Sequence, residues 1–232
     1  MPIILTAALL CLALNDGGSE PLETGLPEPP PAWALLERHL LMQLYPAALE
    51  FVERYTGPDG TLIWRREWPG MDGSDDGYES FYNFPLYYHW QDRNPVVLEG
   101  LVQLMLGGPN HIYHGGLLHA RLRYFDPQGK RSGVPPDVAA LVDRITPDEV
   151  GVQLVNLHPS QARSVIIQAG LFGEHVFTRV RYREFEAPVD RKHLNIRLRP
   201  GSVTRLTIGM RRWVNAPTYA FPWSSGDRLQ DP

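Results

Sequence analysis

Hydrophobic side chains recur every three or four residues over residues 32–55, and this spacing predicts one amphipathic helix with a face to bury. The positions are Trp33, Leu36, Leu40, Leu44, Ala48, Phe51 and Tyr55. A second helix is predicted from Pro95 to the glycine pair at 107–108, with Asn94 as its cap. Between them, residues 78–90 predict a shorter helix, although their many aromatic rings would also suit a strand.

Beyond residue 110 the pattern changes to short runs with alternating or β-branched residues, separated by Pro, Gly, Asn or Asp. The runs span residues 119–126, 151–157, 164–170, 175–182, 193–200 and 202–214. Several short strands at this spacing predict an antiparallel β-sandwich. The fold class is therefore expected to be α+β, helical first and β-rich afterwards.

Four segments follow from these patterns. They are an apolar leader with a proline-rich spacer (1–31), a helical domain (32–110), a β-sandwich domain (111–223) and a tail (224–232). The opening "IILTAALLCLAL" has about the length of a signal-peptide core and is too short to span a bilayer. It lacks preceding basic residues, but the polar spacer after it favours a secreted or periplasmic protein over a cytoplasmic one.

Composition narrows the classes of function. Of 232 residues, 43% are hydrophobic and 21% charged, which is typical of a globular chain with a buried core. The net charge of -4 argues against nucleic acid as an obligate partner, because phosphate binding depends on accumulated Lys and Arg. The single cysteine, Cys11, excludes an intrachain disulfide and a thiolate metal site.

The stretch of residues 64–82 combines acidic and aromatic side chains in an unusual density. The acids are Asp72, Asp75, Asp76 and Glu79, and the rings considered as binding platforms are Trp64, Trp68, Tyr78 and Tyr82. One interpretation is a sugar-binding or sugar-cleaving surface, because aromatic faces stack on pyranose rings and a carboxyl pair serves glycosidic cleavage. A structural interpretation, with capping acids and buried rings, remains open beside it.

A calcium loop is the third interpretation of the same stretch. Asp72, Ser74 and Asp76, followed by Gly77, match the first half of an EF-hand loop. The twelfth position is Asn83 where a bidentate Glu is expected, so the match is partial. No other cofactor is predicted.

Two long stretches carry a resemblance to a known class. Residues 56–88 resemble the opening helical hairpin of bacterial six-hairpin glycosidase-like proteins, which combine an (α/α) toroid with a β-sandwich. Residues 89–127 and 154–182 resemble the last helix and the C-terminal sandwich of the same proteins. The resemblance implies a carbohydrate ligand and a glycoside hydrolase-like fold, with fold alone not fixing function.

Residues 32–108 are too few for a complete ring of helices, at about 11 to 12 residues each plus connections. We therefore expect a truncated or internally deleted relative with weak or no activity. If it cleaves glycosides, Asp75 or Asp76 and Glu79 would be the acid and base. The alternative is a non-catalytic glycan-binding or protein-interaction β-sandwich module. Apolar helix faces that no other element covers would favour self-association.

Two further groups of residues are weighed. In "HIYHGGLLHA", His114 is a candidate ligand contact, whereas a zinc site is disfavoured because alternate residues of a strand face opposite sides. Arg179, Arg181 and Arg183 share one face of a predicted strand. A solvated sheet face is the default interpretation, and binding of an acidic glycan is the alternative.

Overall fold

The computed structural model describes residues 21–61, 95–109 and 119–224. The described residues form two helices and eleven strands. The helices are α1 (Ala32–Tyr55) and α4 (Pro95–Leu106). The strands are β1 (Leu22–Thr24), β2 (Leu26–Pro27), β3 (Leu122–Asp126), β4 (Arg131–Ser132), β5 (Val138–Ile145), β6 (Glu149–Asn156), β7 (Arg163–Ala169), β8 (Val176–Tyr182), β9 (Phe185–Arg191), β10 (His193–Leu198) and β11 (Ser202–Arg211).

The strands form two sheets, which confirms the α+β class. One sheet has the order β1-β10-β7-β3-β4, and the other has the order β5-β6-β11-β8-β9 with β2 paired to β11. All pairings are antiparallel except that of β1 with β10, which is parallel. All six predicted strand runs are present; β5 and β9 and the short strands β1, β2 and β4 were not predicted.

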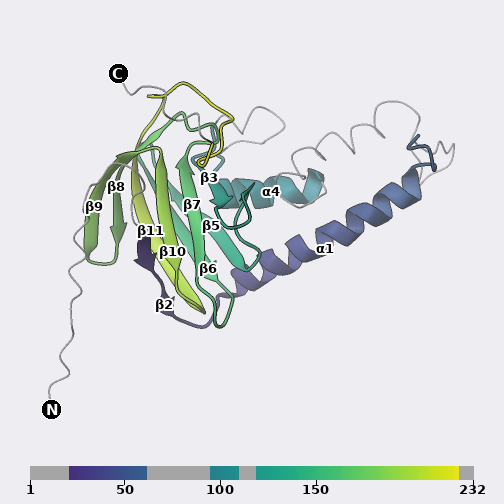
Figure 1. Cartoon of the computed structure of the whole chain (residues 1–232), viewed down its shortest axis with the longest axis horizontal. Helices are drawn as coiled ribbons and strands as arrows, with labels where there is room; N and C mark the ends of the chain where they lie inside the picture. The colour runs from purple at the N-terminus through teal and green to yellow at the C-terminus, as the bar shows by residue number, and fades with distance from the viewer. Residues whose placement is uncertain (1–20, 62–94, 110–118, 225–232) are drawn as a thin grey trace, which may run out of the picture.

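The two sheets share one hydrophobic core, and in Figure 1 they lie as two layers. Alternate residues of each strand point into it, because successive side chains of a strand face opposite sides. Leu122 and Tyr124 of β3 and Ile167 of β7 contribute from one sheet, and Val152 of β6 and Ile208 of β11 from the other. Each is almost completely buried, so this shared core holds the layers together.

Helix α1 packs only its first turns on the outer face of the second sheet. Ala34 contacts a small cluster formed by Ala139, Val155 and Val203, with Trp33 packed beside it. Beyond these turns the helix extends away from the sheets (Figure 1). The predicted helix is confirmed, but Leu36 of its predicted buried face is exposed.

One buried carboxyl joins α1 to the edge of the second sheet. Strand β5 is an edge strand, so one side of its backbone lacks a partner strand. The Oε1 atom of Glu37 accepts a hydrogen bond of 3.0 Å from the backbone N–H of Ala140 on that strand. Burial raises the pKa of Glu37 to about 8, although the Ala140 hydrogen bond and Arg38 oppose the change.

Helix α4 covers one end of the core. Its C-terminal residues Met105 and Leu106 are buried there, and the Met105 carbonyl accepts a hydrogen bond of 2.8 Å from the Tyr124 hydroxyl. Gly107 ends the helix with a positive φ of 68°, and its N–H donates to the Gln103 carbonyl. The predicted helix and its glycine stop are confirmed.

Two expectations need correction. The resemblance to an (α/α) toroid is wrong, because the described part of the chain contains only α1 and α4 beside two β-sheets. The segment interpreted as a spacer also contributes strands: β1 pairs with β10 in one sheet and β2 pairs with β11 in the other. The spacer interpretation missed both strands because they are very short and flanked by prolines.

Candidate functional site

The candidate residues of the acidic and aromatic stretch and His114 cannot be placed in the structure. The proposed acids, rings and calcium ligands at positions 64–82 lie outside the described residues, as does His114. The residues of this stretch that lie outside the described ranges are Asp72, Ser74, Asp75, Asp76, Glu79, Trp64, Trp68, Tyr78 and Tyr82. Whether they form a site stays a prediction, and the candidate site below is built from other residues.

The predicted arginine face is present on β8 but its charges are compensated. Arg179 forms an ion pair of 2.6 Å with Glu149, and Arg181 lies 3.8 Å from Glu186. Both arginines are about half exposed, so each pair stabilises the fold only slightly. Arg183 lies in the turn after β8 with a φ of 56°. This arrangement favours the solvated sheet face over a ligand site.

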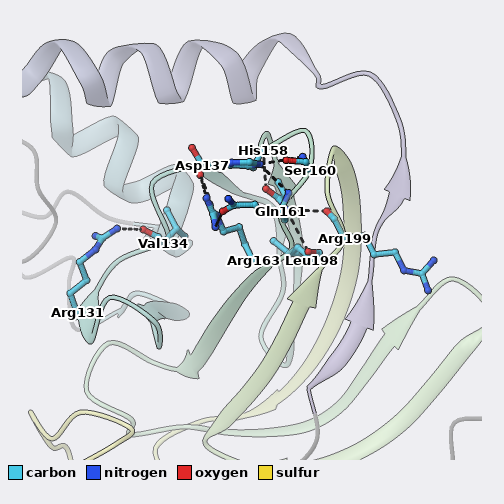
Figure 2. A network of polar contacts seen from close by, with 10 residues as sticks. Arg131, Val134, Asp137, His158, Ser160, Gln161, Arg163, Leu198 and Arg199 are labelled. Carbon is cyan, nitrogen blue, oxygen red and sulfur yellow. Dashed lines mark hydrogen bonds and ion pairs between the residues drawn. The ribbon is translucent and has the colours of Figure 1, made fainter.

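A polar network closes one end of the two sheets (Figure 2). The buried Asn156 donates from Nδ2 to the carbonyls of Gln161 and Arg199, at 2.8 and 3.0 Å, and accepts from the backbone N–H of His158. The guanidinium group of Arg163 is paired with Asp137 nearby. Because these contacts satisfy backbone groups where the chain crosses between the sheets, we interpret this Asn156 end as structural.

The opposite end contains a buried glutamate and histidine. At this end, Leu122 of β3 pairs with Ala169 of β7 in the first sheet, and Arg211 of β11 pairs with Val176 of β8 in the second sheet. The backbone N–H of His175 donates to the Ala169 carbonyl across the gap between them, at 3.2 Å. We call this region the Trp213 end.

Glu174 and His175 are almost completely buried there. The Glu174 carboxylate accepts a hydrogen bond of 2.8 Å from the backbone N–H of Phe172, and its Oε1 lies 3.6 Å from Nε2 of His175. Burial raises the pKa of Glu174. Burial, together with the charges of Arg121 and Arg212, lowers the pKa of His175 to about 4. The imidazole is therefore neutral near pH 7, and the pair has no contact with solvent through which a substrate could reach it.

Trp213 lies over this pair and remains accessible to solvent. Its backbone N–H donates to Nδ1 of His175 at 3.1 Å, and its ring meets the imidazole edge to face at 4.7 Å between centroids. Its φ is 60°, a conformation that is rare for a bulky residue and is held by surrounding contacts. The ring is nevertheless 54% exposed. The structure thus presents a large aromatic surface on a fixed support.

Backbone contacts on both sides of Trp213 fix its position. The N–H groups of Val214 and Asn215 both donate to the Glu174 carbonyl, at 3.0 and 3.2 Å. The side-chain amide of Asn215 donates to the carbonyls of Gly173 and His175. Residues 213–215 are therefore clamped onto residues 173–175, and the backbone that carries the aromatic ring is fixed relative to the sheets.

Two arginines lie near His175 at this end. Arg121 precedes β3, and its backbone carbonyl accepts a hydrogen bond of 2.8 Å from Gly170. Arg212 stands between Arg211, the last residue of β11, and Trp213. Burial lowers the pKa of Arg121, and the nearby charge of Arg212 lowers it further. The two guanidinium groups are therefore close enough to repel each other.

The chain after Asn215 crosses the outer face of the first sheet. Thr218 donates its backbone N–H to the Phe172 carbonyl at 2.8 Å, and Tyr219 meets the Phe172 ring. Phe221 and Trp223 pack edge to face on Phe125 of β3. This C-terminal segment covers the aromatic residues of the sheet and leaves Trp213 at its border.

Sequence reasoning did not find this site. It treated "SVTRLTIGMRRWV" as one strand, whereas β11 ends at Arg211 and the chain turns at Trp213. The available signal was the pair Arg212–Trp213 directly after a strand, with no acidic residue nearby in the sequence. Their neighbours Arg121 and His175 come from distant positions, which no sequence spacing reveals.

Within the described ranges, His, Cys, Asp and Glu side chains form no group of three that could hold a metal ion. Neither α1 nor α4 combines the length and the apolar character that a membrane-spanning helix requires.

Comparison with known proteins gives one match. A family described as a domain of unknown function (DUF8034) matches residues 24–90, which include α1 but not the β-strands after residue 119. No curated protein and no solved structure matches the chain. The match to this family, together with the absence of a toroid from the described residues, overturns the resemblance to six-hairpin glycosidase-like proteins.

Proposed function

We propose that the chain is a non-catalytic binding module of the β-sandwich type, and that its ligand is a glycan bound against Trp213. The observation that carries this proposal is the exposed indole ring on a rigid support at one end of the sheets. A flat aromatic face of this kind stacks on the apolar face of a sugar ring. Because the backbone that carries the ring is already fixed, binding would cost little backbone conformational entropy.

A non-catalytic role fits the chemistry of the Trp213 end. The acid and base that lie closest to each other there, Glu174 and His175, are shielded from solvent. A general acid or base must come within hydrogen-bonding distance of the substrate. The buried pair would therefore support the shape of the site and take no part in a reaction.

The test is a glycan-binding measurement with the full chain and three variants. We expect Trp213→Ala to weaken binding at least about fivefold, and Trp213→Phe to retain part of it, because a phenyl ring keeps some stacking area. Tyr219→Ala is the matched control, since Tyr219 is also an exposed ring in the same segment. Thermal unfolding of each variant verifies the fold. Undiminished binding by Trp213→Ala, or no glycan bound by the natural chain, would refute the proposal.

A second candidate function is self-association through α1. Leu35, Met42 and Leu49 follow each other at intervals of seven residues, and all three side chains are at least half exposed. Such a stripe lies along one side of a helix. It is symmetric about Met42, so an antiparallel second copy would place Leu35 opposite Leu49 and Met42 opposite itself.

Analytical ultracentrifugation tests this second candidate. We expect the natural chain to sediment as a dimer at micromolar concentration and Met42→Glu to sediment as a monomer, because a buried carboxylate pair would repel. Gln43→Glu, at the neighbouring exposed position, is the control and should remain dimeric. A monomeric natural chain would contradict self-association without affecting the glycan proposal.

A further inference from the structure

Two nitrogens of the Arg121 guanidinium group, Nε and Nη1, have no hydrogen-bond acceptor among the described residues. The residue is 7% exposed, and its Nε and Nη1 atoms are shielded from solvent without a hydrogen-bond partner. Within the described residues it also has no ion-pair partner. Buried polar groups almost always find a partner, so an unpaired buried guanidinium requires an explanation.

Arg212 is a second positively charged residue that has no carboxylate partner among the described residues. It is half-buried, and no carboxylate of the described residues forms an ion pair with it. Several other arginines of the same fold have such a partner: Arg163 pairs with Asp137 and Arg179 with Glu149. The carboxylate of Glu174 lies at the same end, but it accepts from Phe172 and faces His175.

The placement of the two arginines follows from the strand ends. Arg121 is joined to Gly170 by a backbone hydrogen bond, and Gly170 directly follows Ala169, whose carbonyl accepts from His175. Arg212 immediately precedes Trp213, whose N–H is bonded to the same histidine. Among the described residues, the fold therefore gathers two positive charges without an ion-pair partner near His175, against which the exposed Trp213 ring packs.

We propose that the Arg121–Arg212 pair selects a glycan that carries a carboxylate or sulfate group. This inference rests on the proposed glycan site and names the charge of its ligand. Arg212 reaches the oxygens directly with its planar guanidinium fork, which suits carboxylate and sulfate geometry. Arg121, which is more deeply placed, contributes attraction that solvent screens less than at an exposed position. The sugar ring that bears the anionic group stacks on Trp213.

The experiment compares three probes at constant ionic strength: inorganic sulfate, a neutral oligosaccharide and an acidic oligosaccharide of equal length. Affinities are measured by calorimetry for the natural chain and for Arg212→Gln. We expect the substitution to weaken binding of sulfate and of the acidic oligosaccharide roughly tenfold, since it removes charge-assisted hydrogen bonds. Arg211→Gln is the matched control, because Arg211 is the adjacent exposed arginine and should leave both affinities within about twofold.

The outcomes separate this inference from the proposed function. Loss of sulfate and acidic-oligosaccharide binding in Arg212→Gln alone supports the inference. Equal affinity for neutral and acidic oligosaccharides, or unchanged sulfate binding in Arg212→Gln, overturns it. Arg212-dependent sulfate binding without binding of either oligosaccharide supports the anion site but refutes the glycan function. Trp213→Ala should weaken binding of the acidic oligosaccharide and leave inorganic sulfate almost unaffected, because sulfate has no ring to stack.

Discussion

The buried carboxyl of Glu37 predicts that the fold loses stability as the pH rises. Its Oε1 accepts from the Ala140 N–H in an almost fully buried position, and its pKa rises from 4.5 to about 8. Because the folded state prefers the protonated carboxyl, this contribution is fully present below pH 4.5. It is lost as the pH rises from 4.5 through 8, because in this range the unfolded chain binds fewer protons than the folded chain.

The size of the effect follows from the two pKa values. One pKa unit corresponds to about 1.4 kcal/mol, so the change from 4.5 to about 8 corresponds to roughly 4 to 5 kcal/mol in the unfolding free energy. Glu37→Gln keeps a carbonyl oxygen for the Ala140 N–H and removes the ionisation. We therefore expect the variant to match the natural chain near pH 5 and to be more stable by about 4 kcal/mol near pH 8.5.

Urea unfolding followed by circular dichroism, at intervals from pH 5 to pH 9, measures this difference. Glu50→Gln is the control, because Glu50 lies on the same helix but is exposed. Glu37→Ala adds a second comparison: it also cannot ionise, but it leaves the Ala140 N–H without its acceptor, at a cost of about 1 to 3 kcal/mol relative to Glu37→Gln at every pH. A stability difference between Glu37→Gln and the natural chain that does not change with pH would refute the reasoning.

Three further predictions concern the two ends of the sheets. The neutral His175 has a pKa lowered from 6.5 to about 4. The unfolding free energy should therefore fall by about 3 kcal/mol as the pH decreases from 6.5 to 4. In urea unfolding measured over this pH range, His175→Gln should abolish the fall. Asn156→Ala should cost about 2 to 4 kcal/mol in chemical unfolding, because it leaves buried carbonyl and N–H groups unpaired. Gly170→Ala would place a Cβ 2.4 Å from the Glu174 carboxyl carbon at a φ of 82° and should lower the melting temperature strongly. Gly201→Ala, which has a φ of 54° and open space around it, should cost only about 1 kcal/mol.

Local patterns predicted the elements of this chain where the periodicity was clear. The helix of residues 32–55 and the strands around residues 122–126 and 202–211 were found from spacing alone. Strand β9 was missed because Pro188 interrupts a polar run. A proline is tolerated in this strand because β9 lies at the edge of its sheet.

The burial of α1 was predicted less well than its existence. Periodicity identifies a face of a helix, but the neighbouring element decides which turns are covered. Here Ala34 and Glu37 are buried against the second sheet, whereas Leu36 remains exposed. An ionisable residue at a buried position could not be expected from hydrophobic spacing, because its place depends on the unpaired edge of β5.

The sequence by itself determined the α+β class, the helices α1 and α4 and the six strands with clear periodicity, because these patterns depend on residues close in the chain. Only the tertiary structure decided that Arg121, His175 and Trp213 lie at one end of the sheets, and that no described acid pairs with Arg121 there. Strand pairing over long separations brings such residues together, and charge compensation depends on which neighbours that pairing supplies. The acidic and aromatic stretch that stood out in the sequence remains a prediction, whereas the candidate site came from residues with no motif of their own.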